Sequence, residues 1–394
     1  MRALTVGNMY PPHHLGGYEL VWLSAVDHLR AGGHDVSVLT TDHRRPDVVA
    51  ADPDWVHRDL RWWWHDHAWP RYGLRQRLRQ ERHNATILAD RLERDRPDVV
   101  VWLAMGGMSL SLIERVRRLG LPAVGVVHDD WLVYGPRVDA WLRLWQGPQA
   151  GLGERLTGVP TRVDLSGAAR WLFVSDFVRR KAIEKGGLQL ARTGIAHSGI
   201  DEAHLAPLGP PRPWGWHVLS VGRIDPRKGI DTAIRALAEL PEAAHLTIAG
   251  DGDGATLQEL RALVAELGLA DRVAFVGFQD TGQLAALYAA ADAVVFPVTW
   301  DEPWGLVPIE AMAHGVPVVA SGRGGSAEYL RDGENALLHR AGDPASLAAA
   351  LRRLAEGPEL RARLRAGGAK TAPRHTARRF NEQLEALLLD AAGE

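Results

Sequence analysis

The chain repeats one pattern twice: short apolar runs that alternate with stretches of helical periodicity. The first series of apolar runs lies at 2–8, 34–41, 98–104, 122–129 and 170–176. The second series lies at 217–223, 245–252, 272–278, 293–298 and 317–322. Apolar residues recur with helical spacing at 18–33, 230–240, 255–267, 281–291 and 306–314. Buried strands that alternate with helices form doubly wound parallel sheets, so the sequence predicts an α/β protein with two Rossmann-like domains and a cleft between them.

A Pro- and Gly-rich stretch, "LAPLGPPRPWGW" (205–216), separates the two series and is typical of a linker. We therefore predict an N-terminal domain over 1–205 and a C-terminal domain over 206–373. The pattern of 374–394 is that of an amphipathic helix, which we expect to pack on the N-terminal domain. A length of 394 residues suits two hydrophobic cores.

Composition excludes several classes of protein and site. The chain has no cysteine, which excludes disulfides, thiolate metal sites and cysteine nucleophiles. The net charge of −2 argues against binding of nucleic acid. No apolar run is long enough to span a membrane, and "MRALTVGNMYPP" lacks the long apolar stretch of a signal peptide, so we expect a cytoplasmic protein.

The segment "PPHHLGGYE" (11–19) joins the first strand to the first helix. Gly16 and Gly17 stand where a backbone can approach a ligand closely, next to a helix N-terminus that favours anions. A tight turn between strand and helix explains the same two glycines. The segment is not a G-x-G-x-x-G fingerprint, which argues against a nicotinamide cofactor.

The segment "SVGRIDPRKGID" (220–231) follows the first strand of the second series. Arg223 and Lys228 lie on the loop that opens the next helix, where two cations can hold a diphosphate. Solvated loop charges are the alternative. The chain has only four lysines, which makes Lys228 conspicuous.

The segment "DEPWGLVPIEAMAHGVPVVAS" (301–321) is the most specific pattern in the chain. Glu302 and Glu310 are eight residues apart and flank the start of a helix. The amides of residues 305–307 suit anions and sugar hydroxyls, and Glu310 can accept two hydrogen bonds from a vicinal diol such as ribose. Paired carboxylates also serve glycoside hydrolysis, but there they must flank a single bond.

These segments together resemble the retaining glycosyltransferases of family 4, over nearly the whole chain. The resemblance rests on Gly16-Gly17, on Arg223…Lys228-Gly229 and on Glu302-Pro303-Trp304-Gly305…Glu310-Ala311. It implies the GT-B fold, with two Rossmann-like domains facing each other across a cleft. It also implies a nucleoside-diphosphate sugar held mainly by the C-terminal domain and an acceptor on the N-terminal domain.

The resemblance assigns a role to each of these positions. Arg223 and Lys228 would hold the diphosphate and stabilise the departing nucleotide. Glu302 and the 305–307 amides would hold the donor sugar, and Glu310 the ribose. The remaining expected donor contacts are Gly16, Gly17, Phe278, Gln279, Trp304, Gly305, Leu306 and Val307.

His128, in "VVHDDW", matches a histidine that the family places near the donor sugar. Its expected role is to bind the sugar and to steady positive charge at the anomeric carbon; a lone histidine is otherwise more often structural. "DGDG" (251–254) and "HDD" (128–130) imitate metal-binding motifs. We expect no metal and no cofactor, with UDP or GDP as the nucleotide of the donor.

The same fold serves other activities that the sequence leaves open. A nucleotide-sugar 2-epimerase would need acid and base carboxylates in the cleft, where this chain has the Glu302-Pro303-Trp304-Gly305 turn instead. A phosphorylase would need a pyridoxal lysine, and none of the four lysines lies in a suitable motif. A catalytically silent sugar-binding module is a further alternative. The acceptor class is equally open between a natural product, a glycolipid and a polysaccharide precursor.

"RWWWHDHAWPR" (61–71) follows a strand candidate at 55–62 and places tryptophan at three consecutive positions. With strand-like alternation, Trp62 and Trp64 share one face and Trp63 takes the other. The cluster fits a core, an acceptor platform together with Asp129, or a membrane contact. The arginines of the basic stretch 71–82 would assist the last of these.

Overall fold

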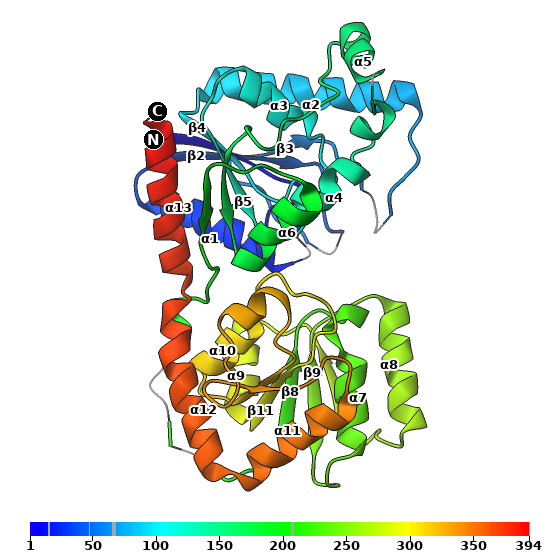
Figure 1. Ribbon diagram of the computed structural model, residues 1–394, viewed down its shortest axis with the longest axis vertical. Coiled ribbons are helices and arrows are strands. Elements are labelled where there is room, and N and C mark those ends of the chain that lie inside the picture. Colours follow the sequence, from blue (N-terminus) through cyan, green and yellow to red (C-terminus); the bar gives the residue numbers. More distant parts are fainter. Residues whose placement is uncertain are drawn as a thin grey trace. The chain divides into compact units, whose positions relative to one another are not determined.

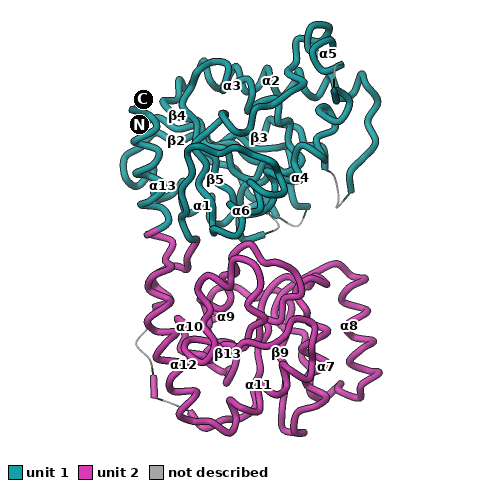
Figure 2. Tube along the Cα trace, viewed as in Figure 1, with its two compact units in different colours: residues 1–197, 380–394 teal, residues 198–379 magenta. Residues whose placement is uncertain are grey.

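The computed structural model describes residues 1–14, 16–46, 48–64, 68–147, 149–205, 209–210 and 212–393. The chain forms two compact units (Figure 2). Unit 1 comprises Met1–His197 and Phe380–Glu394, and unit 2 comprises Ser198–Arg379. The division thus falls ahead of the expected linker, of which residues 206–208 and 211 lie outside the described residues.

The described residues of unit 1 form a seven-stranded sheet in the order β3-β2-β1-β4-β5-β6-β7, with every neighbouring pair parallel. The strands are β1 (Arg2–Val6), β2 (Asp35–Thr41), β3 (Val56–Leu60), β4 (Val99–Trp102), β5 (Ala123–Val127), β6 (Arg170–Phe173) and β7 (Thr193–Ile195). Helices cover both faces of the sheet (Figure 1). They include α1 (Gly17–Ala31), α2 (Leu74–Asp95), α3 (Ser111–Arg118), α4 (Trp131–Val138), α5 (Gln149–Thr157) and α6 (Asp176–Gly186). The strand order reverses between β1 and β4.

The last helix, α13 (Ala377–Ala392), belongs to unit 1 from Phe380 onward. Its buried residues Phe380, Leu384 and Leu388 join the same core cluster as Trp22 of α1. A polar contact fixes the helix as well, because the Glu385 carboxylate accepts bonds from two histidines of unit 1 at 2.8 and 2.9 Å. The amphipathic pattern of the C-terminus therefore reflects one apolar stripe that faces the unit 1 core.

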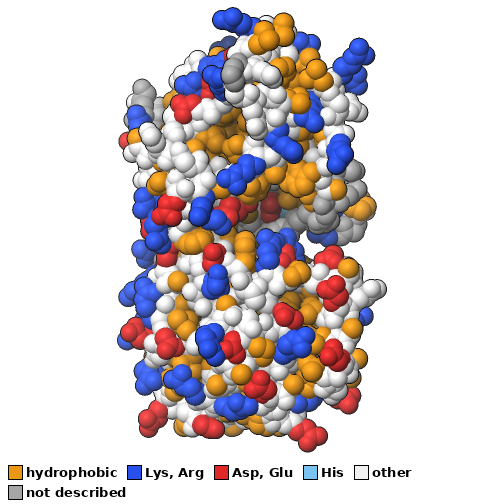
Figure 3. All heavy atoms as spheres, turned by 45° about the vertical axis from the view of Figure 1, so that its right-hand side comes forward, with side chains coloured by type: hydrophobic (Ala, Val, Ile, Leu, Met, Phe, Trp, Pro, Cys, Tyr) orange, Lys and Arg blue, Asp and Glu red, His pale blue; other side chains and the backbone are white. Residues whose placement is uncertain are grey.

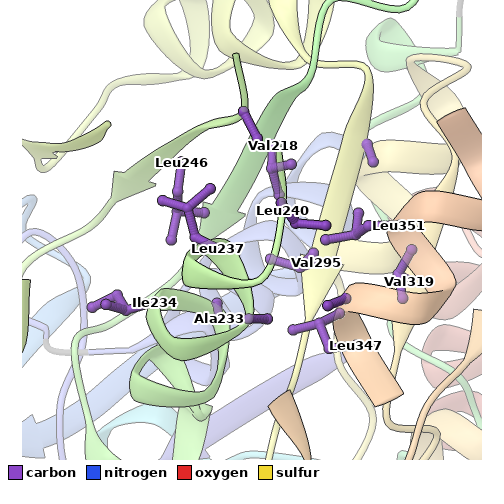
Figure 4. Close-up of a cluster of buried hydrophobic side chains, with 14 of the residues drawn as sticks. Val218, Ala233, Ile234, Leu237, Leu240, Leu246, Val295, Val319, Leu347 and Leu351 are labelled. Carbon is purple, nitrogen blue, oxygen red and sulfur yellow. The ribbon is translucent and has the colours of Figure 1, made fainter. Parts of the chain in front are cut away.

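Unit 2 carries a six-stranded parallel sheet in its described part, in the order β10-β9-β8-β11-β12-β13. The strands are β8 (His217–Val221), β9 (His245–Ala249), β10 (Val273–Gly277), β11 (Ala293–Phe296), β12 (Val318–Ala320) and β13 (Leu337–Leu338). Its helices include α7 (Ile230–Ala238), α8 (Gly254–Glu266), α9 (Thr281–Ala290), α10 (Val307–Ala313), α11 (Pro344–Glu356) and α12 (Pro358–Thr371). Leu237 of α7, Val295 of β11 and Leu351 of α11 meet in the core that Figure 4 shows. The order reverses here between β8 and β11.

The prediction of two Rossmann-like parallel-sheet domains is confirmed. The short strands β7 and β13 were not predicted, because each has too few residues for a periodic signal. No helix within the described residues is long and apolar enough to cross a membrane. Basic and acidic side chains are interspersed over the face that Figure 3 shows, as the small net charge leads one to expect.

Candidate active site

The site in unit 2 forms where the strand order reverses. Arg223 and Lys228 lie just after β8, and residues 302–307 lie between β11 and α10. Strands β8 and β11 are neighbours in the sheet, so their carboxyl ends bring the two segments together although they are far apart in the sequence. Open α/β sheets bind ligands at such a reversal point.

An ion pair joins the two segments directly. Lys228 Nζ donates to Glu302 Oε2 at 2.7 Å, and the indole Nε1 of Trp300 donates to the same oxygen at 2.9 Å. The Glu302 side chain is nearly buried, and that of Lys228 is one quarter exposed. Because both donors share Oε2, Oε1 keeps its capacity to accept a ligand hydroxyl.

Asp225 organises the arginines beside this pair. It holds the Arg227 guanidinium with two bonds of 2.9 and 2.7 Å and contacts Arg223 at 3.3 Å. Hydrogen bonds from Arg227 hold the pKa of Asp225 well below its usual range, so the carboxylate stays ionised. Arg227 also lies over the Trp300 ring at 4.5 Å. Neither Asp225 nor Trp300 was predicted from the sequence, although each lies two residues from a predicted site residue.

Two glycines with positive φ let these loops close up. Gly229 has a φ of 67°, and a Cβ there would lie 2.0 Å from the Pro297 carbonyl oxygen. Gly305 has a φ of 88°, and a Cβ there would lie 2.9 Å from the Phe296 ring. Any other residue would therefore push the loop after β8 or the turn before α10 out of place.

The start of α10 presents the predicted amides. Gly305, Leu306 and Val307 are partly exposed there, and the Tyr329 hydroxyl donates to the Gly305 carbonyl at 2.6 Å. The first amides of a helix have no partner within it. Trp304 differs from its predicted role: its side chain is 3 % exposed, and its Nε1 donates to the Ser198 carbonyl at 2.9 Å. The indole therefore anchors the turn, and the Trp304 side chain is not open to a ligand.

Glu310 lies in the first turn of α10 and has a partner that the sequence did not reveal. The hydroxyl of Tyr288, on α9, donates to Glu310 Oε2 at 2.7 Å. The buried Tyr288 ring stacks on His314, with ring centroids 4.8 Å apart. Burial and the Glu310 charge hold the pKa of Tyr288 well above its usual range, so the hydroxyl remains a donor. No sequence motif links the two residues, which are 22 positions apart.

The predicted donor contacts Phe278 and Gln279 follow β10. The Phe278 side chain is 73 % exposed, while its backbone amide donates to Asp251 Oδ1 at 3.0 Å. The Gln279 side chain donates to the carbonyls of Val276 and Phe278. An exposed ring at the carboxyl end of a strand can stack on a flat ligand.

The two aspartates of "DGDG" (251–254) form hydrogen bonds that support local structure. Asp251 holds the Phe278 amide, and Asp253 accepts from the Thr256 amide at 2.8 Å as the N-cap of α8. Over the described ranges, no three His, Asp or Glu side chains group in a way that could hold a metal ion. The motif thus reflects a turn and a helix cap.

In unit 1, the predicted glycine pair begins α1. Gly16 is the N-cap, and its amide donates to Glu19 Oε2 at 3.1 Å. A Cβ on Gly17 would meet nothing within 4 Å, so packing inside the unit does not explain a glycine there. The position is consistent with close approach of a ligand to the backbone. Leu15 lies outside the described residues.

His128 and Asp129 follow β5. The His128 ring stacks on Tyr18 with centroids 4.6 Å apart, and burial lowers its pKa to about 3, so the imidazole is neutral near pH 7. Asp129 accepts from the Trp131 amide at 3.0 Å and from the Tyr134 hydroxyl at 3.1 Å. Burial raises the pKa of Asp129 to about 6. A neutral histidine can bind sugar hydroxyls as donor and acceptor.

The three tryptophans divide as the alternation predicted, although β3 ends at Leu60 before them. The ring centroids of Trp62 and Trp64 are 4.6 Å apart, and both side chains are partly exposed. Trp63 is 1 % exposed and packs on Tyr72 at 5.3 Å. Its expected role in acceptor binding is therefore wrong, because Trp63 is a core residue. His65, Asp66 and His67 of the same stretch lie outside the described residues.

The arginines of the basic stretch contact their own unit in part. Arg77 donates to the carbonyls of Tyr72 and Ala140 at 2.7 and 2.6 Å. Arg82 contacts the Thr157 carbonyl at 3.3 Å. These bonds explain two of the charges without a membrane, and membrane contact stays a prediction.

Known sequences resemble both units. The family model described as "Glycosyl transferases group 1" matches residues 215–371, and the model described as "Glycosyltransferase Family 4" matches residues 15–204. A D-inositol 3-phosphate glycosyltransferase of Thermomonospora curvata is 41 % identical over 191 residues, which are 46 % of this chain and 44 % of the relative. A protein of the same name from Acidothermus cellulolyticus is 34 % identical over 278 residues, 66 % of this chain and 59 % of the relative. The chain therefore matches only about half the length of these curated relatives.

Solved structures share the fold. Anabaena HepE, crystallised with UDP, is 22 % identical with a TM-score of 0.71 over 99 % of this chain and 100 % of its own. Sucrose-phosphate synthase of Thermosynechococcus elongatus is 22 % identical with a TM-score of 0.75 over 98 % of both chains. The two family models fall on the two units, and the paired motifs meet at the reversal point of unit 2. The chain belongs to the glycosyltransferases of the family 4 and group 1 type, which have the GT-B fold.

Proposed function

We propose that the protein transfers a sugar from a nucleoside-diphosphate sugar to an acceptor hydroxyl, with retention of the anomeric configuration. The observation that carries this proposal is the Lys228–Glu302 ion pair at the reversal point of unit 2, with Arg223 held on the same loop by Asp225. It offers cations for a diphosphate directly beside a carboxylate for sugar hydroxyls. UDP is our first choice of nucleotide, because HepE was crystallised with UDP and with UDP-glucose.

In this proposal unit 2 binds the donor along its carboxyl edge. Lys228 and Arg223 bind the diphosphate, while Glu302 Oε1 and the amides at 305–307 bind the sugar. Glu310 accepts the ribose hydroxyls. The exposed ring of Phe278 stacks on the base.

The bond that breaks joins the anomeric carbon to a diphosphate oxygen, and the acceptor oxygen bonds to that carbon on the same face. The acceptor proton passes to an oxygen of the departing diphosphate. Negative charge develops on the leaving group, so the fixed cations at 223 and 228 supply the main stabilisation of the transition state. From unit 1, neutral His128 accepts or donates a hydrogen bond to the sugar as positive charge develops at its anomeric carbon.

A thermal-shift screen with UDP, GDP, ADP and TDP sugars tests donor binding, because a ligand of the native state raises the midpoint. We expect one nucleotide to raise the midpoint and the matching sugar donor to release that nucleotide slowly in water. Proton NMR of a glycosylated product then gives the anomeric configuration. No shift with any donor contradicts the proposal. Donor binding without nucleotide release indicates a silent module, and a C2-epimerised sugar indicates an epimerase.

A further inference from the structure

The carboxyl edge of unit 1 carries an aromatic group, which we call the aromatic edge: His43, Trp62, Trp64 and Trp69. The His43 ring lies nearly at right angles to Trp62, with centroids 6.1 Å apart, and 6.2 Å from Trp64. Trp69 is 45 % exposed. These residues follow β2 and β3 at the end of the sheet where parallel strands present ligands.

The loop after β4 holds the aromatic edge in place. Trp62 Nε1 donates to the Gly106 carbonyl at 3.0 Å, and the Trp63 amide donates to the Gly107 carbonyl at 3.0 Å. Gly107 has a φ of 77°, and a Cβ there would lie 2.6 Å from Trp62 and 2.8 Å from Trp69. The indoles are therefore packed against bare backbone in fixed positions, which lowers the entropy that they lose when a ligand binds.

The same loop connects the aromatic edge to Asp129. A Cβ on Gly106 would lie 2.0 Å from the Tyr134 hydroxyl, and that hydroxyl donates to Asp129 Oδ2 at 3.1 Å. Gly106 thus lies between Trp62 and the Tyr134–Asp129 pair. One ligand can place a hydroxyl near Asp129 and a flat apolar group on the indoles.

Two arginines of this part of unit 1 are engaged in their own contacts. Arg58 binds Asp52 through Nε at 2.9 Å and the Tyr10 carbonyl through a second nitrogen at 3.0 Å. Arg44, next to His43 in the chain, pairs with Asp52 at 3.2 Å. Both arginines therefore already share the Asp52 carboxylate, whereas the edge itself offers aromatic rings.

We propose that the aromatic edge selects an acceptor with a flat apolar group, such as an aromatic aglycone, next to its reacting hydroxyl. The proposal rests on the proposed function, since it names the class of acceptor for that transfer. Paired indoles offer a large rigid surface for an aromatic ring in offset or edge contact. A single sugar ring would cover only part of that surface.

Calorimetric titration of the full chain, with the donor's nucleotide bound, tests the acceptor class. The probes are a p-nitrophenyl glycoside, the methyl glycoside of the same sugar, and D-inositol 3-phosphate. We expect the p-nitrophenyl glycoside to bind about tenfold more tightly than the methyl glycoside. Trp64→Ala and Trp62→Phe should reduce this ratio, the first to near one. Trp214→Ala, which removes a partly buried indole from unit 2, should leave it unchanged.

Each contrary result has a distinct meaning. Nucleotide binding without any preference for the aromatic glycoside overturns the aromatic edge proposal and leaves the glycosyltransferase proposal intact. Tighter binding of D-inositol 3-phosphate, unaffected by Trp64→Ala, overturns it as well. Failure of every nucleotide to bind overturns the proposed function itself. Trp62→Phe keeps an aromatic ring but loses the bond to Gly106. A reduced affinity ratio of the two glycosides in this folded variant would show that the position of the ring matters as well as its presence.

Discussion

The carboxyl edges of the two sheets share a skeleton and differ in chemistry. Around the reversal point both sheets have the same strand order, β3-β2-β1-β4 in unit 1 and β10-β9-β8-β11 in unit 2. Unit 2 places paired charges there, with Lys228 held by Glu302. Unit 1 places aromatic rings there, together with His128 and Asp129. The strands therefore set where a ligand binds, and the loops decide its class.

Protonation follows the same division. In unit 2 the hydrogen bonds from Arg227 lower the pKa of Asp225, so charge is retained by pairing. In unit 1 burial acts against charge, because it lowers the pKa of His128 to about 3 and raises that of Asp129 to about 6. An ionised edge suits a diphosphate, and a less charged edge suits a neutral acceptor.

We call the carboxyl edge of unit 2, with its paired charges, the charged edge. The largest effect is expected there, for Lys228→Ala. Loss of a fixed cation at the leaving group should lower kcat by about 10²–10³-fold, as for the loss of one oxyanion donor. It also removes one of the two donors to Glu302 Oε2 and leaves the Trp300 indole in place. Steady-state kinetics with the donor found in the thermal-shift screen measures the effect. The matched control is Lys370→Ala, an exposed lysine of α12 in the same unit, which should turn over normally.

Near-normal turnover of folded Lys228→Ala would mean that Lys228 does not stabilise the leaving group. Arg223→Ala then tests whether the second cation stabilises the leaving group instead. Its side chain is about half exposed and contacts Asp225 at only 3.3 Å, so we expect a smaller loss than at Lys228.

The next effect concerns the cost of burying a charged carboxylate in unit 1. The pKa of Asp129 is raised from 3.8 to about 6 on folding, so its contribution to stability is fully present below about pH 4 and is lost as the pH rises through 6. Asp129→Asn removes that loss while keeping an acceptor for the Trp131 amide. We expect the free energy of unfolding to rise by about 2 kcal/mol at pH 7.5 and by about half as much at pH 5. Urea unfolding at both pH values measures the difference.

His128, next to Asp129, should change the free energy of unfolding with pH in the opposite direction. Its pKa is lowered from 6.5 to about 3 on folding, so its contribution is present above pH 6.5 and is lost as the pH falls toward 3. His128→Gln should therefore show its smallest penalty at low pH. If the stability difference from the parent protein changes with pH in the same direction for Asp129→Asn and His128→Gln, burial does not explain the altered pKa values of unit 1.

How much of this was predictable from the sequence depends on how local each signal is. The strands, the Arg223–Lys228 loop and the Glu302–Glu310 turn are each encoded in a short window, so their places could be expected from periodicity and spacing. The burial of Trp304 could not, because its indole packs on Tyr329 and His375, far along the chain. Alternation correctly separated Trp63 from its neighbours, but whether that face meant core or ligand depended on the packing around Tyr72. Tertiary contacts decide between core and site where local pattern allows both.

The smallest expected effect tests a residue of the charged edge that only the fold reveals. Tyr288→Phe keeps the ring stacked on His314 and removes the hydroxyl that donates to Glu310 Oε2. A hydrogen bond to a charged group contributes about 1.5–3 kcal/mol, part of which water can replace at this partly exposed carboxylate. We therefore expect the donor KM to rise roughly three- to tenfold with kcat nearly unchanged, because the ribose is bound equally in the ground and transition states. The discrimination between UDP and 2′-deoxy-UDP should fall in the same variant, since the proposed function has Glu310 bind the ribose and Tyr288 donates to that carboxylate. A loss of kcat with unchanged discrimination would instead mean that Tyr288 only supports the packing of α9 on α10. In that case, the charged edge would owe its geometry to the loops alone.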